Sequence, residues 1–450
     1  MDFANLDQLL KAIDVPVLEH TIDHITNTTH TTKPTQITKP KTKFLFVGTH
    51  AHQFTGYSKV SYNLMKELSK NEQIDLYHFA FQKFSDPPKD WRILPDNVKV
   101  YDVFANEKIY GINENGFGFS LLPDYIKLIQ PDYVMIYNDA MIISNFLDML
   151  ETKLTPEERS KFKQLIYFDQ VYEFQRPSLL HRIDKETYAY FAFTNYWKDV
   201  LKSYGISKPI YVLNHGFDPS EFKQLDKNEL RKKHGLPNDH LIFLNLNRNT
   251  PRKHYDILIM AFAQLVVRFP TQKVLLMCVC DEGTYGGYPI LDIFAHQLSL
   301  YKVPFEGHMH KLVIVKDSMS FSDAMINELY CLSDVGISTA DGEGFGLCQF
   351  ESMGLGIPQI VPYVGGFKEF CKNRINSICV NPKIKTYIPL VIGGIGGIAE
   401  LCDYKDICLA MEDYMLDSEL RETHGRNAKD TISQYSWTNV VKELVNVLTN

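Results

Sequence analysis

The stretch Asp341-Gly-Glu-Gly-Phe-Gly-Leu-Cys-Gln-Phe-Glu351 joins a glycine-rich turn to a helix and places two carboxylates eight positions apart. Residues 332–339 before it have the pattern of a buried strand, and residues 348–355 have helical spacing. A turn between such a strand and such a helix lies at the carboxyl end of a parallel strand, where open α/β sheets bind ligands. The stretch therefore predicts an α/β fold with a ligand site at this turn.

The residues of this turn have the chemistry of a sugar-nucleotide site. Gly344 and Gly346 leave backbone N–H groups open to a diphosphate, and the following helix adds the positive end of its dipole. Glu343 can accept hydrogen bonds from sugar hydroxyls, and Glu351, about two turns into the helix, can reach a ribose diol. For this stretch taken alone, the alternative is an ordinary tight turn followed by a capping or solvated glutamate.

A group of cations lies upstream of the turn. The apolar run 241–246 looks like the first strand of a new sheet, and Asn247-Arg-Asn-Thr-Pro-Arg-Lys253 is its exit loop. Arg248 and Lys253 are suited to hold a departing diphosphate and to neutralise its charge. Arg252 could face either the phosphate or solvent. A solvated loop before a helix is the alternative, since charged residues usually lie outside.

These two groups of residues resemble those of the retaining glycosyltransferases of the GT-B fold, specifically the large family 4 group. The family signature is two glutamates separated by seven residues around Gly-Phe-Gly, which Glu343 and Glu351 match, and residues 365–369 continue the pattern. Residues 214–218 resemble the segment that precedes the family's domain linker. The resemblance implies two Rossmann-like domains with doubly wound parallel sheets, which face each other across a cleft.

The resemblance also assigns roles to residues of this chain. It implies that Glu343 orients the sugar, and that Arg248 and Lys253 stabilise the leaving diphosphate. The expected donor-binding residues are Glu351, Gly344, Phe345, Gly346, Leu347 and Gly56. A retaining transferase of this kind attacks from the front face, so that the leaving phosphate deprotonates the acceptor hydroxyl and no protein nucleophile is required.

No metal ion or other cofactor is expected in this site. The chain contains no Asp-x-Asp sequence, which is the usual ligand pattern of the metal-bridged diphosphate in the other main glycosyltransferase fold. Cationic side chains and helix amides should take the place of the metal. The co-substrate would be a UDP- or GDP-sugar, and the sequence does not distinguish between the two bases.

Length and composition agree with a two-domain protein that does not bind nucleic acid. The chain has 450 residues, of which 45% are hydrophobic, and this is enough for two cores. A net charge of −7 gives no basic footprint for nucleic acid. None of the eight cysteines forms a CxxC pair, and no apolar run has the length of a membrane span. We therefore expect reduced thiols and a cytoplasmic location.

The chain divides into four expected regions. Residues 1–43 are rich in Thr, Lys and His and form a flexible tail. Residues 44–215 repeat strand, loop and helix, which predicts an amino-terminal acceptor domain with a seven-stranded parallel sheet. Residues 216–425 repeat the scheme with six strands and form the donor domain. Residues 426–450 resemble the family's closing helices, the last of which crosses back to the first domain.

The amino-terminal domain departs from the family pattern at two places. Gly56 begins a helix and can present N–H groups to a ligand, but Thr55 replaces the usual paired glycine. Asn138-Asp139 stands where family members commonly have a histidine. Asp139 could accept a hydrogen bond from a hydroxyl or help to deprotonate the acceptor, while a helix cap is the ordinary role of such a pair. The pair His50 and His52 could bind a metal, but no third ligand is evident.

The sequence therefore predicts a hexosyltransferase-like enzyme that moves a sugar from a nucleotide sugar to a hydroxyl of a glycan, protein or lipid acceptor. A non-catalytic sugar-nucleotide or glycan binding module on the same fold is the main alternative, and the departures at Thr55 and Asp139 favour it. Another enzyme on the same fold, such as an epimerase or a phosphorylase, is the third candidate.

Overall fold

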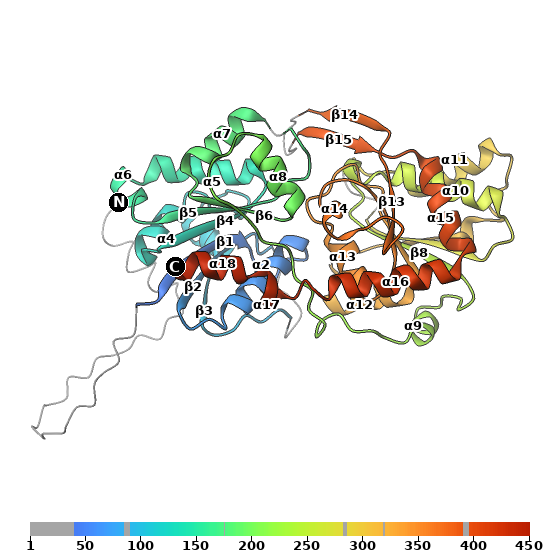
Figure 1. Ribbon diagram of the computed structural model, residues 1–450, viewed down its shortest axis with the longest axis horizontal. Coiled ribbons are helices and arrows are strands. Elements are labelled where there is room, and N and C mark those ends of the chain that lie inside the picture. Colours follow the sequence, from blue (N-terminus) through green and yellow to red (C-terminus); the bar gives the residue numbers. More distant parts are fainter. Residues whose placement is uncertain (1–39, 85–90, 175, 282–285, 318–319, 390–395) are drawn as a thin grey trace, which may run out of the picture.

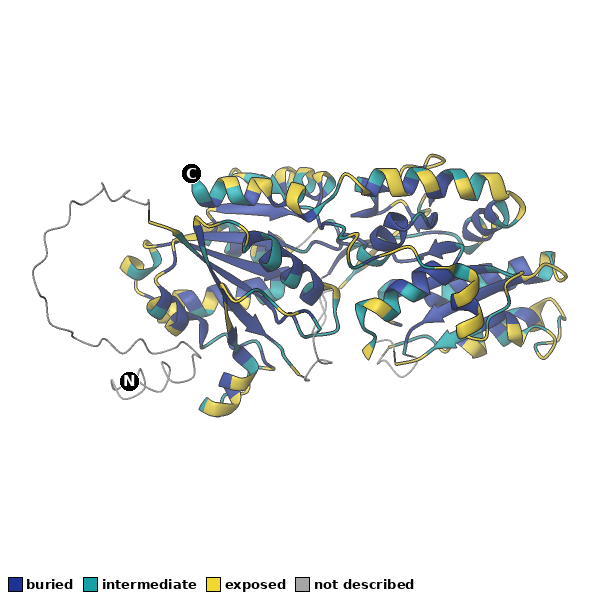
Figure 2. Cartoon of the chain, turned by 90° about the horizontal axis from the view of Figure 1, so that it is seen from below, coloured by how far each residue is buried: buried dark blue, intermediate teal, exposed yellow. Residues whose placement is uncertain are grey.

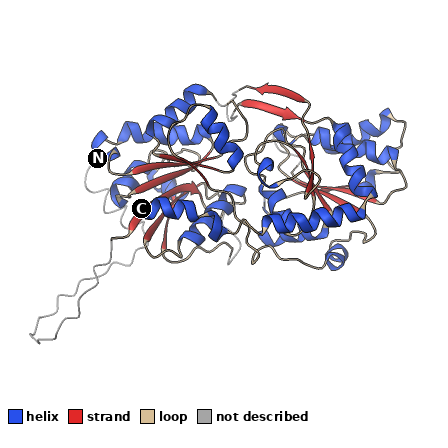
Figure 3. Ribbon diagram, viewed as in Figure 1, coloured by secondary structure: helices blue, strands red, loops and turns tan. Residues whose placement is uncertain are grey.

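Two parallel sheets, one in each half of the chain, organise the molecule into two domains (Figure 1). The computed structural model describes residues 40–84, 91–174, 176–281, 286–317, 320–389 and 396–450. Helices lie on both faces of each sheet (Figure 3), and the central strands of both sheets are buried, whereas most of the edge strands are partly exposed (Figure 2). The predicted fold class, two Rossmann-like doubly wound domains, is confirmed. Most of the expected tail, residues 1–39, lies outside the described residues.

The amino-terminal sheet has the strand order β3-β2-β1-β4-β5-β6-β7, and all of its neighbours pair in parallel. Its strands are β1 (Thr42–Thr49), β2 (Ile74–Phe81), β3 (Val98–Asp102), β4 (Tyr133–Asn138), β5 (Lys163–Phe168), β6 (Ala189–Ala192) and β7 (Ile210–Val212). Its helices are α2 (Gly56–Leu68), α3 (Val103–Tyr110), α4 (Leu122–Ile129), α5 (Ala140–Lys153), α6 (Pro156–Arg159), α7 (Pro177–Glu186) and α8 (Asn195–Ser203). The order reverses between β1 and β4, which is the switch point where such sheets bind ligands.

The carboxyl-terminal sheet has the order β10-β9-β8-β11-β12-β13, and it is also parallel throughout. Its strands are β8 (Leu241–Leu246), β9 (Val274–Val279), β10 (Leu312–Val315), β11 (Val335–Ile337), β12 (Gln359–Pro362) and β13 (Ser377–Val380). Its helical segments are α9 (Lys227–Lys233), η1 (Pro251–Lys253), α10 (Tyr255–Arg268), α11 (Ile290–Leu300), η2 (Met309–Lys311), α12 (Asp323–Leu332), α13 (Leu347–Gly354), α14 (Phe367–Phe370), α15 (Tyr404–Leu416) and α16 (Ser418–Ile432). Strands β8 and β11 are neighbours, so their exit loops leave the sheet side by side. These two loops carry the predicted cations and the glutamate turn.

The chain crosses between the domains twice, and the two crossings touch. The Phe217 N–H donates to the Tyr435 carbonyl at 2.7 Å, and Phe217 also forms a parallel bridge with Ser436. Beyond this point α17 (Trp437–Val440) contacts α2, and α18 (Lys442–Thr449) contacts β1, so the end of the chain lies on the amino-terminal domain (Figure 1). Helix α16 is continuous through the expected division at residues 425 and 426.

An antiparallel hairpin that the sequence did not predict extends from the carboxyl-terminal domain. It consists of β14 (Ile384–Ile388) and β15 (Gly397–Leu401). Glu173 of the amino-terminal domain forms a bridge with Ile398 of β15, so the hairpin reaches across the domain boundary, at the top of Figure 1. Strand β14 is largely exposed, so its side chains do not form the buried apolar face by which a strand is predicted from sequence.

Candidate functional site

The glycine-rich turn between β11 and α13 is held by close backbone contacts. Gly346 has a φ of 91° and begins α13, whose first turn has no side-chain cap. A Cβ atom on Gly346 would lie 2.4 Å from the Phe367 ring, and one on Gly344 would lie 2.1 Å from Asp169 Oδ1. The Gly366 N–H donates to the Glu343 carbonyl at 2.8 Å. Glycine is therefore required at positions 344 and 346, and the uncapped end of α13 suits an anion.

The Phe345 side chain packs into the core instead of facing a ligand. It is 3% exposed and lies against Phe350, Phe370 and His215, with ring centroids 5.0, 5.4 and 4.3 Å away. Only the backbone of Phe345 is therefore in a position to contact a donor. The packing of its ring fixes the turn on the hydrophobic core.

Glu343 forms an ion-pair cluster with two cations of the loop after β8. Lys253 Nζ lies 2.6 Å from Glu343 Oε2, and Arg252 Nη1 lies 3.3 Å from the same oxygen. Arg252 also donates to the Gly342 carbonyl at 2.6 Å. Burial by itself would raise the pKa of Glu343, but Lys253 and Arg252 outweigh it and lower the pKa to about 2. The glutamate is therefore ionised, and Arg252 belongs to the cluster instead of pointing into solvent.

Arg248 differs from the other two cations of this loop. Arg248 is exposed, and its side chain makes no ion pair or hydrogen bond within the part of the chain that the structure describes. Partial burial and the neighbouring Arg252 lower the pKa of Arg248, while Tyr57 and Glu343 act in the opposite direction, so its guanidinium lies near these groups. Arg248 is thus a cation with its full hydrogen-bonding capacity available to a ligand.

Glu351 lies at the domain boundary, where it pairs with a lysine of the other domain. Lys59 Nζ, on α2, lies 2.8 and 3.0 Å from the two carboxylate oxygens of Glu351, and the Tyr330 hydroxyl donates to one of them at 3.0 Å. Cys348 lies one turn before Glu351. Burial and Glu351 raise the pKa of its thiol, while Lys59 and Lys253 act in the opposite direction, so the thiol lies near all three side chains. The two glutamates of the motif therefore belong to one continuous region along the start of α13.

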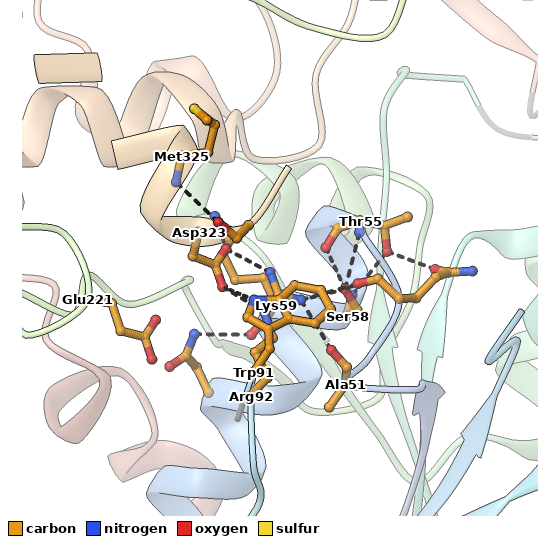
Figure 4. Close-up of polar contacts among 12 residues, drawn as sticks. Ala51, Thr55, Ser58, Lys59, Trp91, Arg92, Glu221, Asp323 and Met325 are labelled. Carbon is orange, nitrogen blue, oxygen red and sulfur yellow. Dashed lines mark hydrogen bonds and ion pairs between the residues drawn. The ribbon is translucent and has the colours of Figure 1, made fainter. Parts of the chain in front are cut away.

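The cross-domain contact continues beyond Lys59 into a network of buried charges (Figure 4). Lys59 Nζ is also 3.3 Å from Asp323 on α12. Arg92 of the amino-terminal domain binds Asp323 through Nε and Nη2, both at 2.8 Å, and donates to the Ala51 carbonyl and to Ser58. Two cations of one domain thus neutralise two carboxylates of the other. This network links the predicted ribose-binding residue to the loop that precedes α2.

The amino-terminal candidates Gly56 and Asp139 both lie at helix starts. A Cβ on Gly56 would meet the Leu347 side chain at 3.6 Å, so the start of α2 faces the start of α13. Thr55 forms a capping box with Ser58 at this helix start. Asp139 Oδ1 caps α5 by accepting from the Met141 and Ile142 N–H groups at 2.9 and 3.1 Å. This is the helix-cap arrangement that the sequence left open as the alternative for Asp139.

Asp169, Tyr57 and Tyr172 also belong to the site, and the sequence analysis missed all three. The Tyr57 hydroxyl donates to Asp169 Oδ2, and the Tyr172 hydroxyl donates to Asp341 Oδ1 at 2.8 Å across the domain boundary. Asp169 directly follows β5, just as Asp139 directly follows β4. A search of every strand end for carboxylates, and not of the family position alone, would have found it.

The histidines and cysteines that the structure describes form no cluster suited to a metal. His50 and His52 lie with their ring centroids 4.8 Å apart, but among the residues that the structure describes no group of three His, Cys, Asp or Glu side chains could hold an ion. All eight cysteines are free thiols. No helix in the described ranges combines the length and the apolar character needed to cross a membrane.

Two Rossmann-like domains that face each other in this way are the architecture of the GT-B fold, and solved structures of this fold superpose on about nine-tenths of the chain. Sucrose-phosphate synthase (tll1590) from Thermosynechococcus elongatus matches with a TM-score of 0.66 at 14% identity, over 90% of this chain and 98% of that chain. Anabaena Alr3699/HepE in complex with UDP-glucose matches with a TM-score of 0.64 at 15% identity, over 90% and 99%. At such identities these likenesses establish the fold.

Residues 226–392 match the family described as Glycosyl transferases group 1, which agrees with a resemblance to glycosyltransferases of the GT-B fold, while the family 4 subtype stays a prediction. A relative of Methanocaldococcus jannaschii, "Uncharacterized glycosyltransferase MJ1607", is 28% identical over 244 residues, which are 53% of either chain. Phosphatidyl-myo-inositol mannosyltransferase of Mycolicibacterium smegmatis is 23% identical over 214 residues, 47% of this chain and 46% of that protein. The matches thus span about half the length of these relatives.

Proposed function

We propose that this chain is a retaining glycosyltransferase that transfers a sugar from a UDP- or GDP-sugar to the hydroxyl of a glycan, protein or lipid acceptor. The observation that carries the proposal is the cluster of Glu343, Lys253 and Arg252 beside the uncapped start of α13. Arg248 lies near this cluster and makes no ion pair with any residue that the structure describes. A fixed anion and several cations at one helix start suit a ligand that has both hydroxyls and a diphosphate. The structural neighbour Alr3699/HepE, solved in complex with UDP and with UDP-glucose, supports a uridine donor.

The reaction that we propose breaks the bond between the anomeric carbon and the diphosphate oxygen, and forms a bond from that carbon to the acceptor oxygen on the same face. The acceptor proton passes to the leaving diphosphate. Arg248, Lys253 and the amides at the start of α13 stabilise the charge on that diphosphate, in the place of a metal ion. Glu343 accepts hydrogen bonds from the sugar hydroxyls. Glu351 binds the ribose of the donor while it keeps part of its contact with Lys59.

The close contact of the domains supports exclusion of water from this reaction. Trp197 Nε1 donates to the Gly344 carbonyl at 2.8 Å, and both Asn195 N–H groups, backbone and side chain, donate to Glu369 at 2.9 Å. Contacts of this kind on the glycine-rich turn between β11 and α13, the donor turn, bring the acceptor domain against the reacting centre. Water that would hydrolyse the donor is thereby kept out.

The test is a screen of UDP, GDP, UDP-glucose, UDP-galactose, UDP-N-acetylglucosamine and GDP-mannose with and without EDTA. A ligand that binds the folded state stabilises it by mass action, by about 2.7 kcal/mol at a ligand concentration of one hundred times Kd. This stabilisation raises the melting temperature. We expect stabilisation by one nucleotide class, and slow release of its diphosphate from the matching sugar nucleotide with or without EDTA. Failure of all six compounds to bind would contradict the proposal.

The second candidate is a binding module without transferase activity. The use of Asp139 as a helix cap and the engagement of Glu351 by Lys59 favour it, because both side chains are then occupied. Selective binding of one sugar nucleotide with no release of diphosphate, in the presence of sugar acceptors, would support this candidate. The eight free thiols support a reducing compartment such as the cytoplasm for either function.

A further inference from the structure

Asp169 holds a carboxylate at the edge of the amino-terminal sheet that faces the donor turn. Its N–H donates to the Asn138 carbonyl at 3.0 Å, which fixes its backbone between the ends of β4 and β5. The hydroxyl of Tyr57, in the first turn of α2, donates to Asp169 Oδ2. One carboxylate oxygen is therefore satisfied and the side chain is fixed, although neither Asp169 nor Tyr57 has a role in the family motifs found in the sequence.

The other carboxylate oxygen is covered, and it has no hydrogen-bond partner among the residues that the structure describes. Asp169 Oδ1 is buried without a donor from these residues, and it lies 2.1 Å from the position of a Cβ on Gly344. The side-chain amide of the next residue, Gln170, is fully buried, and within the described part of the chain neither its nitrogen nor its oxygen has a partner. Buried polar atoms in folded proteins are nearly always hydrogen-bonded. The unmet oxygen of Asp169 against Gly344, followed by a residue with an unmet amide, therefore indicates a place where a ligand supplies the missing partner of Asp169.

The charged groups around Asp169 come from each element that packs on it. Tyr57 faces it from α2, Asp139 from the start of α5, Arg252 from η1, and Glu343 from the donor turn. Burial raises the pKa of Asp169 to about 6, helped by Asp139 and Glu343, while the Tyr57 hydrogen bond and Arg252 act in the opposite direction. The carboxylate is ionised at neutral pH, and it is a strong acceptor for a hydroxyl.

We propose that Asp169 Oδ1 accepts a hydrogen bond from a hydroxyl of a sugar bound between the two domains, and that Tyr57 positions the carboxylate for it. This inference rests on the proposed transferase function. The hydroxyl belongs either to the donor sugar or to the acceptor, since both would meet at the contact between Asp169 and Gly344. Asp169, and not the helix cap Asp139, is then the carboxylate that the amino-terminal domain contributes to the reacting centre.

The first experiment uses Asp169→Asn, with the sugar nucleotide that the wild-type chain consumes in the screen above and with its free diphosphate. The matched control is Asp184→Asn, because Asp184 accepts from the Tyr190 hydroxyl at 3.1 Å in the same domain, between α7 and β6. We expect Asp169→Asn to slow diphosphate release by about 10- to 100-fold, as for the loss of a hydrogen bond to a charged group. We expect the control to release diphosphate at the wild-type rate.

Calorimetric binding identifies the source of the hydroxyl. If Asp169 holds the donor sugar, the variant loses affinity for the sugar nucleotide but not for the free diphosphate. If it holds the acceptor, both affinities stay unchanged while turnover falls. A variant that keeps both affinities and the wild-type turnover overturns the inference but leaves the proposed function standing. A wild-type chain that consumes no sugar nucleotide overturns both.

The second experiment tests the positioning role through the pH profile of Tyr57→Phe. The Tyr57 hydroxyl stabilises the ionised carboxylate, so its removal raises the pKa of Asp169. Activity that needs the carboxylate is lost as the pH falls through this pKa, and the acidic limb of the profile should therefore move to higher pH in Tyr57→Phe. An acidic limb at the same pH in Tyr57→Phe and in the wild type would contradict the positioning role.

Discussion

Lys59 Nζ lies 2.8 and 3.0 Å from the carboxylate oxygens of Glu351, although the two residues are 292 positions apart and belong to different domains. Both side chains are less than a tenth exposed. Burial lowers the pKa of Lys59, but the carboxylates of Glu351 and Asp323 outweigh it and raise the pKa above its usual value. The glutamate expected to bind ribose therefore also fastens the two domains together.

We expect Lys59→Met to lower stability strongly, because it leaves Glu351 and Asp323 buried with one cation fewer. Removal of one partner of a buried ion pair costs about 3–5 kcal/mol. The measurement is the thermal midpoint of the variant. The control is Lys202→Met, which removes a surface pair with Asp199 and should change stability by no more than about 0.5 kcal/mol. Equal midpoints for the two variants would argue against a buried cross-domain pair.

Arg248→Ala should weaken diphosphate binding while it leaves the fold intact. Arg248 has no ion pair within the described ranges, so its removal strands no buried charge and should change stability by about 0.5 kcal/mol or less. Loss of a charge-assisted hydrogen bond should weaken binding of the preferred nucleoside diphosphate by roughly 10- to 100-fold. Lys253→Met should differ by lowering stability as well, since Lys253 is the nearest cation to Glu343. Calorimetry measures the affinity of both variants for the nucleoside diphosphate, and thermal denaturation measures their stability.

Acidification should remove the stability that Glu343 contributes. Its folded-state pKa is about 2, below its ordinary value of 4.5, so the contribution is complete above pH 4.5 and is lost as the pH falls towards 2. The shift corresponds to about 3 kcal/mol. We expect the gap in stability between the wild type and Glu343→Gln to narrow as the pH is lowered from 5 to 3. A gap that stays constant over this range would show that the ion pairs do not depress the pKa.

His215 should make the protein less stable in mild acid. It is buried against Phe193 and Phe345, and burial lowers its pKa from 6.5 to about 3. Below pH 6.5 the unfolded chain therefore gains a proton that the folded chain does not bind, which costs about 2 kcal/mol at pH 5. His215→Leu should lose less stability than the wild type between pH 7.5 and pH 5. The other buried histidines are common to both proteins, so they cancel in this comparison.

The sequence by itself determined the elements of the fold and the chemistry of the donor side. Buried strands such as residues 241–246 and 274–279 are continuous apolar runs, and the alternation of strand and helix admits few topologies. The motif from Asp341 to Glu351 can be recognised in the sequence because its residues lie close together along the chain. The same is true of the loop that carries Arg248 and Lys253. Their meeting could be expected because the exit loops of parallel strands emerge at one edge of the sheet.

Only the tertiary structure decided which charges meet across the domain boundary. The pairs Lys59–Glu351 and Tyr172–Asp341 join segments 292 and 169 positions apart, and no local pattern encodes such contacts. It also assigned Asp139 to a helix cap and placed Asp169 against Gly344, although both carboxylates follow parallel strands. Propensity and periodicity act over a few residues, whereas the electrostatic environment of a side chain depends on every element packed around it. For this reason the sequence identified a sugar-nucleotide type of turn, and the packing of the two domains determined which side chains surround it.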